Sequence, residues 1–534
     1  MATNVVNLDA LIPREDLGIK GDPSAAPART TTIRVSDLET SAFFFSALRK
    51  PDFQRETSNW TPQKIADFVK TFLDEELIPA IILWSAGENV FVIDGAHRLS
   101  AIIAWVNNDY GDGESSREFF KNNIPPEQLK AADRTRTLLN KAVGTYIEHK
   151  AAVQHPENSR PEIVRRSKRL GSLALELQWV RASNAEKAEA SFFKINQEAT
   201  PIDPTELLIL KSRKSPNAIA ARAIVRSGTG HQYWSHFSNQ RQSEITRISR
   251  EIYEALYMPN LQTPIKTLDL PVAGRGYGAQ TLPLIFDLVN LTNDHKIDST
   301  KPASKNSSKN AVIATDNDGA ETIKSLSNTQ RLIDRISSTA AGSLGLHPAL
   351  YFYGRSGNYQ PSAFLGAVSF IKWLDETDKY NDFTKSRQRF EEFLLKNKDY
   401  IGRVVHKYGS GGRSIPWVRQ LYKRIFTWIN DGLDEARLLE MLAKDDDFAF
   451  LTMADPLSEG KSRGNVGGDF TRNTKSAAFL KEALDSAIKC KICGGLLHVN
   501  SITVDHIHRR VEGGSSAVEN AQMSHPYCNT TFKN

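Results

Sequence analysis

All three cysteines of this 534-residue chain lie in its last 45 residues, and their spacing constrains how that segment can fold. Cys490 and Cys493 are separated by two residues, and His525 and Cys528 repeat this spacing. Three thiolates and one imidazole fill the tetrahedral shell of a structural zinc ion. A segment of about 55 residues has too little core to be stable alone, so a metal is the expected support. Three unrelated buried cysteines are the alternative, which the paired spacings disfavour.

The composition is that of an ordinary globular protein, because 40% of the residues are hydrophobic and 24% are charged. A chain of this length has room for about two to four domains. No apolar run approaches the roughly 18 residues of a membrane-spanning helix, and the N-terminus lacks a signal-peptide pattern. So few cysteines suit a reducing compartment, so the chain is expected to be cytoplasmic. The lack of a membrane-spanning run predicts that it has no membrane partner. The net charge of +6 is compatible with nucleic-acid binding but does not establish it.

The chain is expected to be a multidomain α+β protein with five segments. A polar stretch rich in Pro, Ala and Thr predicts a flexible N-terminal arm or an extended strand, and two stretches poor in large apolar residues predict a surface loop and a linker. The expected segments are the arm at 1–40, a mixed α/β domain at 41–240, a helical connector at 241–455 with a loop at 296–320, the linker at 456–478, and a small separate domain at 479–534. The loop and the linker are expected to let the last domain move.

Local patterns predict the elements that position the polar motifs. Thr61 followed by Pro62 predicts a helix start, because a side-chain oxygen caps free amides and Pro suits the first helical position. Apolar runs at 78–84 and 90–93 predict two strands, and 99–105 predicts a helix. Between 418 and 429 the apolar residues recur with helical period, which predicts an amphipathic helix.

A second set of polar residues lies between and after the cysteine pairs. Asp505 and His506 end a predicted strand, and a Gly-Gly pair, Asn520 and Asn529 follow. Asp505 is a hard oxygen ligand of the kind that Mg²⁺ or Mn²⁺ prefers. An imidazole can take a proton from water at physiological pH, so His506 is a candidate general base.

The ordered features C-x-x-C, D-H-I, G-G, N and H-x-x-C-N over residues 490–534 resemble the HNH nucleases, the ββα-metal family. The resemblance implies that His506 activates a water molecule against the scissile phosphate. It also implies that Asp505 and Asn529 hold the single catalytic metal ion and that Asn520 fixes the loop behind the site.

Some positions depart from the family pattern. Arg509 stands where the family usually has proline, Phe532 stands where it usually has lysine with Lys533 one residue later, and His525 replaces a more frequent cysteine. His508 is a rival base, although a solvent-facing residue is the simpler interpretation. Nearby basic residues either face DNA phosphates or form a solvated surface; they are Lys489, Lys491, Arg509 and Arg510.

A further motif near the N-terminus is Asp94-Gly95-Ala96-His97-Arg98, at the junction of a predicted strand and helix. Free amides at a helix start attract anions, and an arginine beside them can bind phosphate through two hydrogen bonds. The simpler alternative is that Asp94 caps the helix and Arg98 pairs with a surface carboxylate.

Together with Phe53-Gln54-Arg55, Trp60-Thr61 and residues 192–196, this motif resembles the ParB-like domain of GmrSD-type restriction enzymes and SspE-type defence proteins, over roughly residues 40–235. The family form is D-G-Q-Q-R, and D-G-A-H-R here is intermediate between it and the G-x-H-R of ParB and sulfiredoxin. The resemblance implies a nucleoside triphosphate pocket. Its expected residues are Arg98 and Arg55 on phosphates, Asp94 near the metal or attacking water, and Gln54, Gly95 and His97 in the lining.

The predicted function is a metal-dependent DNA endonuclease of a restriction or anti-phage system, gated by a nucleotide- or modification-sensing N-terminal domain. Structural zinc, catalytic Mg²⁺ or Mn²⁺, a nucleoside triphosphate and foreign DNA are the expected cofactors and partners; nucleotide hydrolysis and homo-oligomerisation stay open. The alternative is a nucleotide-gated DNA-binding regulator whose C-terminal domain is a non-catalytic zinc knuckle. Asp505, His506 and Asn529 favour the nuclease, because a binding module has no need of them.

Overall fold

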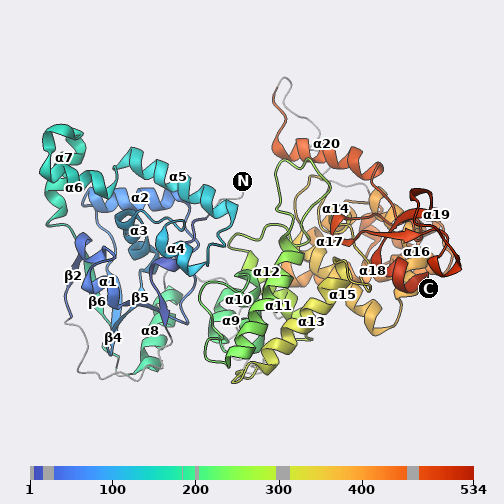
Figure 1. Cartoon of the computed structure of the whole chain (residues 1–534), viewed down its shortest axis with the longest axis horizontal. Coiled ribbons are helices and arrows are strands. Elements are labelled where there is room, and N and C mark those ends of the chain that lie inside the picture. Colours follow the sequence, from blue (N-terminus) through green and yellow to red (C-terminus); the bar gives the residue numbers. More distant parts are fainter. Residues whose placement is uncertain are drawn as a thin grey trace. The chain divides into compact units, whose positions relative to one another are not determined.

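The computed structural model describes residues 5–15, 29–182, 184–198, 204–295, 313–453 and 468–533 (Figure 1). The chain forms two compact units. The first comprises Met1–Lys214, Thr229–His236 and Tyr277–Thr281, and the second comprises Ser215–Gly228, Phe237–Gly276 and Leu282–Asn534. The main division therefore lies at residue 214 and not near the expected residue 240, because α10 (Pro216–Val225) packs against α11 (Asn239–Tyr257) and α13 (Ala320–Ile336). No helix in the described ranges is long and apolar enough to cross a bilayer.

A six-stranded mixed sheet organises the first unit, in the order β1-β3-β5-β4-β6-β2. The central strands β4 and β5 are antiparallel neighbours, as the two apolar runs predict, whereas β1–β3, β3–β5 and β4–β6 pair in parallel and β2–β6 antiparallel. The strands are β1 (Arg14–Glu15), β2 (Thr32–Arg34), β3 (Leu48–Pro51), β4 (Ile81–Ala86), β5 (Asn89–Asp94) and β6 (Ala174–Trp179).

The two faces of this sheet are both covered, which follows from the alternation of side chains along a strand. Val90 and Val92 of β5 join the core formed with α2 (Pro62–Leu73) and α3 (Ala96–Asn107). Phe91 and Ile93 point to the opposite face, where they pack with Phe192 of α8 (Ala185–Glu198). Figure 1 shows α2 and α3 on one side of the strands and α8 on the other.

Two helices of the first unit agree with the sequence predictions. The Thr61 hydroxyl accepts a hydrogen bond from the Lys64 amide at 3.2 Å, and Pro62 opens α2, as predicted. The predicted helix at 99–105 is the centre of α3. The remaining helices are α1 (Phe43–Ala47), α4 (Glu114–Phe119), α5 (Pro126–Ala142), α6 (Tyr146–Gln154), α7 (Pro161–Leu170) and α9 (Pro204–Lys211).

For the described residues of 1–40 the structure contradicts the flexible arm and agrees with the alternative of extended strands. β1 pairs with β3 at the edge of the sheet, and β2 pairs with β6. Val6, Leu8 and Ile12 are buried in the core that α2 and α3 share. Burial of these few apolar side chains holds the segment against the core, although the segment as a whole is polar. Its overall composition therefore could not predict this placement.

The second unit is mostly helical. The predicted amphipathic stripe forms α18 (Ile415–Asn430), whose buried face contacts α15 (Pro361–Glu376) and α16 (Tyr380–Lys396). The other helices are α12 (Thr281–Thr292), α14 (Pro348–Tyr351), α17 (Tyr400–Tyr408), α19 (Glu435–Ala443) and α20 (Arg472–Asp485). The part of the expected loop at 296–312 lies outside the described residues.

The expected linker at 456–478 is partly helical. The segment after it does not form a compact unit of its own. Thr471 caps the Thr474 amide at 3.1 Å and starts α20, whose Leu480 and Leu484 are buried one turn apart. The segment at 479–534 belongs to the second compact unit, together with the helices before it. It contains the two-stranded antiparallel sheet of β7 (Thr503–His506) and β8 (Ala521–Ser524) and a final π-helical turn at Cys528–Phe532.

Candidate functional site

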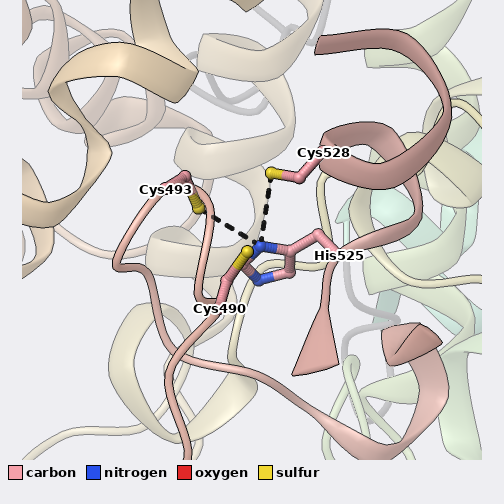
Figure 2. A group of neighbouring side chains, drawn as sticks. All are labelled: Cys490, Cys493, His525 and Cys528. Atoms are coloured by element: carbon pink, nitrogen blue, oxygen red, sulfur yellow. Dashed lines mark hydrogen bonds between the residues drawn. The ribbon is translucent and has the colours of Figure 1, made fainter. Parts of the chain in front are cut away.

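Four buried side chains of the C-terminal segment converge on one point. Cys490 and Cys493 lie in the loop after α20, His525 directly follows β8, and Cys528 opens the π-helical turn. One ligand atom from each lies within 4.8 Å of the others. Figure 2 shows the sulfur atoms and the imidazole turned toward a common centre. The cluster therefore has the donor set and the geometry of a closed, structural zinc site, as the spacings predict.

The orientation of His525 fits metal binding. Its Nε2 lies 2.9 Å from the Leu496 carbonyl oxygen, to which the ring N–H donates, and its Nδ1 lies 3.4 Å from the Cys493 sulfur. A ligand histidine is commonly fixed by such a hydrogen bond from its other nitrogen. Burial lowers the pKa of His525, and the Arg387 guanidinium acts in the same direction. Both effects favour the neutral ring, the form in which a histidine binds a metal ion, although Nδ1 also lies 3.4 Å from Arg387 Nη1.

Asp505 and His506 lie together on β7, opposite Gln522 and Ala521 of β8. Asp505 is buried, and its Oδ2 accepts hydrogen bonds from Gln522 Nε2 and from Lys533 Nζ, both at 2.7 Å. His506 is half-buried. Strand β7 thus carries, at adjacent positions in the sequence, a carboxylate that is fixed by hydrogen bonds and an imidazole that is partly exposed.

Asn529 is brought next to this strand by the π-helical turn. Its backbone N–H donates to the His525 carbonyl at 3.0 Å, and its side-chain Nδ2 donates to the Val504 carbonyl at 3.4 Å. Cys528 of the Cys₃His cluster is its direct neighbour. The same turn therefore completes the metal cluster and places the amide of Asn529 beside the strand that carries Asp505.

Asn520 fixes the loop between β7 and β8. Its Oδ1 accepts from the His508 amide at 2.7 Å, and its Nδ2 donates to the carbonyls of His508 at 3.1 Å and Ser515 at 2.7 Å. A Cβ on Gly514 would lie 1.9 Å from the His508 carbonyl oxygen, which accounts for a glycine there. Asn520 thus acts on the backbone of the loop, as the resemblance implies.

The other polar residues that the sequence singles out in this segment are more exposed than Asp505. His508 is exposed, and only its backbone takes part in the contacts with Asn520. Arg509 is half-buried, and its guanidinium donates to the backbone carbonyl of Lys533. The exposed basic side chains are Lys489, Lys491 and Arg510.

In the first unit, the motif at 94–98 joins β5 to α3 as predicted. Gly95 adopts φ of +91°, a left-handed conformation that suits glycine, and a Cβ there would lie 2.6 Å from Ile81 Cδ1. Arg98 pairs with Asp94 at 2.5 Å and donates to the carbonyls of Pro79 and Ala80. Asp94 therefore binds Arg98 and does not cap the helix, because α3 has no side-chain cap hydrogen bond among the described residues.

Gln54, Arg55 and His97 lie near the start of α3. The side-chain oxygen of Gln54 and Nε2 of His97 are buried without a hydrogen-bond partner among the described residues. The His97 ring stacks on Trp60 with centroids 5.7 Å apart. Burial lowers the pKa of His97 to about 3, and the positive charges of Arg55 and Lys50 add to this effect. Two unused polar atoms thus lie in a region of positive potential.

Sequence reasoning missed the buried charge cluster that holds Gln54 and Arg55. Asp9 Oδ1 receives Arg14 Nη2 and Lys50 Nζ, both at 2.7 Å. Arg14 also donates to the carbonyls of Gln54 at 2.5 Å and Arg55 at 2.9 Å. The N-terminal segment therefore sets the backbone of the Gln54–Arg55 loop. An Asp followed by an Arg in a polar segment gives little signal of this, because Lys50 is 41 residues away.

Two family models match the regions that contain these residues. The family model of the GmrSD restriction endonuclease N-terminal domain matches residues 37–212, and that of the HNH endonuclease matches residues 490–534. The search of curated proteins and the search of solved structures gave no significant match. The chain therefore carries an N-terminal GmrSD domain at 37–212 and a C-terminal HNH endonuclease domain at 490–534, and the two domains together support a restriction-type nuclease.

Proposed function

We propose that the protein hydrolyses phosphodiester bonds of foreign DNA, such as phage DNA, at the β7–β8 site, under the control of a ligand bound by the GmrSD domain. The observation that carries the proposal is the joint placement of Asp505, His506 and Asn529 by one short ribbon and one turn, beside a Cys₃His cluster. A zinc knuckle that only bound DNA would need the cluster but not these three residues. The nuclease is therefore favoured over a DNA-binding regulator.

In the proposed reaction, His506 takes a proton from a water molecule whose oxygen attacks the phosphorus, and the bond to the leaving oxygen breaks. Asp505 and Asn529 would hold Mg²⁺ or Mn²⁺, which when bound supplies positive charge that stabilises the negative charge on the phosphate in the transition state. Asn520 acts as a positioning residue, because its contacts fix the backbone two residues beyond His506. Exposed Lys489, Lys491 and Arg510 are suited to the DNA backbone.

The control element is proposed to be an anion site at the start of α3, for a nucleoside triphosphate. Its support is the charge of Arg55 near the unpartnered buried Nε2 of His97, while the unpartnered Gln54 side-chain oxygen, an acceptor, suits a hydroxyl or amine of the nucleotide. The free amides at the start of a helix add a site for phosphate oxygens. Arg98 is held by Asp94 and by backbone carbonyls, so Arg55 is the better candidate for a first phosphate contact.

The test is plasmid cleavage by the purified full-length protein. Modified and unmodified plasmid are each incubated with Mg²⁺ or Mn²⁺, with and without each nucleoside triphosphate. Cleavage that needs a divalent ion and changes with nucleotide or DNA modification is the expected result. Tight DNA binding with no cleavage under any of these conditions would favour the regulator.

A further inference from the structure

The π-helical turn at the end of the HNH domain places Lys533 against Asp505. In the family pattern the lysine stands at position 532, which is Phe532 here. The Lys533 amide donates to the Cys528 carbonyl at 3.1 Å, an i to i+5 bond, whereas an α-helix would use the amide of residue 532. The wider turn accommodates one extra residue. Lys533 thereby reaches the site despite its shift in the sequence.

The two departures from the family pattern contact each other. The guanidinium of Arg509, at the usual proline position, donates to the backbone carbonyl of Lys533. At its other end, Lys533 Nζ contacts Asp505 Oδ2 at 2.7 Å and also the His506 carbonyl. Lys533 is therefore fixed both by its backbone and by its ammonium group, and its side chain is 20% exposed. The contact between Lys533 and Asp505 is therefore held at several points and differs from an exposed surface ion pair.

We propose that Lys533 is a cationic latch that competes with the divalent metal for Asp505 and makes metal binding depend on DNA. This inference rests on the proposed function, in which Asp505 is a metal ligand. An ammonium group and a divalent cation repel each other strongly when both contact one carboxylate with little exposure to water. Metal binding at Asp505 therefore requires Lys533 to move away, which lowers the metal affinity of the free protein.

The phosphodiester backbone gives the released ammonium a new partner. DNA at the β7–β8 site brings negative charge to Lys533, so that moving Lys533 off Asp505 costs less when DNA is bound. Metal and DNA then bind cooperatively, and by linkage each raises the affinity of the other by the same factor. Couplings of this kind usually amount to about 5–150-fold. The latch would keep the site from binding metal until DNA is in place.

The test measures Mn²⁺ affinity by electron paramagnetic resonance on the full-length, zinc-loaded protein. Every protein carries H506A, which prevents cleavage, and is titrated with and without a short DNA duplex. In the absence of DNA, K533M should tighten Mn²⁺ binding at least about fivefold, and the effect of DNA on Mn²⁺ affinity should shrink. K533R, which keeps the positive charge, should stay near the parent.

K481M is the matched control, since it removes an exposed lysine of α20 from the same unit. Equal Mn²⁺ affinity in K533M, K481M and the parent would overturn the latch, and so would weaker binding in K533M. Zinc content and thermal melting establish that K533M is folded, and if it is not, K533Q replaces it. D505N tests the underlying function separately: Mn²⁺ binding unchanged by D505N would show that Asp505 is no metal ligand.

Discussion

Arg387 and Glu391 form a buried ion pair one turn apart on α16, with Nε and Oε1 at 2.7 Å and side chains 1% and 3% exposed. The second oxygen of Glu391 accepts the Leu496 amide at 2.7 Å, in the loop that follows the first cysteine pair. Arg387 also donates to the carbonyls of Leu344 and Gly345. One ion pair thus joins the HNH domain to the helices before it, which contradicts the expected freely moving domain.

Glu391→Gln should therefore destabilise the second unit as a whole. Breaking a buried pair leaves Arg387 charged and without its carboxylate, which typically costs about 3–5 kcal/mol. Glu392→Gln is the control, because Glu392 is half-buried and its side chain accepts from the exposed Gln388. Denaturant unfolding checks the difference. Equal midpoints for the two variants would mean that the pair contributes nothing to docking.

Cys528→Ser should remove the bound zinc and destabilise the HNH domain. Binding and folding share one free energy in small zinc modules, so loss of a ligand appears in both. Elemental analysis should give about one zinc per chain in the parent and much less in the variant. His506→Ala is the control and should keep its zinc. A folded, active protein without zinc would refute the structural role of the cluster.

His506→Ala should abolish DNA cleavage and leave DNA binding largely intact. Loss of a general base typically lowers the rate by about 10²–10⁴-fold. His508→Ala is the matched control, since His508 is an exposed imidazole two residues away whose backbone alone contacts Asn520. Single-turnover cleavage of a plasmid measures both rates. The opposite ranking would make His508 the base.

The Cys₃His cluster, α2, the β4–β5 pair and α18 could be predicted from the sequence because their signals are local: paired spacings, a capped start and a periodic apolar face. The polar clusters that hold the sites could not. Glu391 meets Leu496 across 105 residues, and Lys50 meets Asp9 across 41. The position of Lys533 depends on the π-helical turn, and the residues around that turn carry no clear sequence signal for it. The features that the sequence did not predict are thus polar contacts between residues far apart in the chain and the type of the last helical turn.

The second unit should lose stability as the pH falls below neutrality. Burial lowers the pKa of His498 to about 4 against the opposing effects of Asp269 and the Leu270 carbonyl. Burial also holds the pKa of His347 well below 6.5, assisted by His498, Lys398 and Arg387. These rings stay neutral in the folded protein while the unfolded chain takes up protons below about pH 6.5. The free energy of unfolding therefore falls between about pH 6.5 and 4.

Urea unfolding of the parent and of His347→Phe at several pH values checks this sign. Removing one such ring should reduce the slope by at most about 1.4 kcal/mol per pH unit, the value for one proton. His406→Asn, which removes an exposed imidazole of the same unit, serves as the control. A slope that His347→Phe leaves unchanged would mean that this ring takes up its proton equally in both states.

Arg55→Ala and Arg98→Ala should separate ligand binding from folding in the GmrSD domain. Arg98 is held by Asp94 at 2.5 Å and by the Ala80 carbonyl at 3.1 Å, so its loss should mainly lower the thermal midpoint. Arg55 is half-buried beside His97, and its loss should mainly weaken nucleotide binding. A charge-assisted contact to phosphate is worth on the order of 1.5–3 kcal/mol, which corresponds to roughly 10–150-fold in affinity.

The same Arg55→Ala protein tests whether the two domains are coupled. A ligand can shift the nuclease only through different affinities for its active and inactive arrangements, so weaker nucleotide binding must move the nucleotide dependence of cleavage to higher concentration. Nucleotide titration and plasmid cleavage are measured on one preparation, with Arg134→Ala on the exposed surface of α5 as the control. If affinity falls and cleavage stays the same on every substrate and at every nucleotide concentration, the GmrSD domain does not gate the HNH site through this pocket.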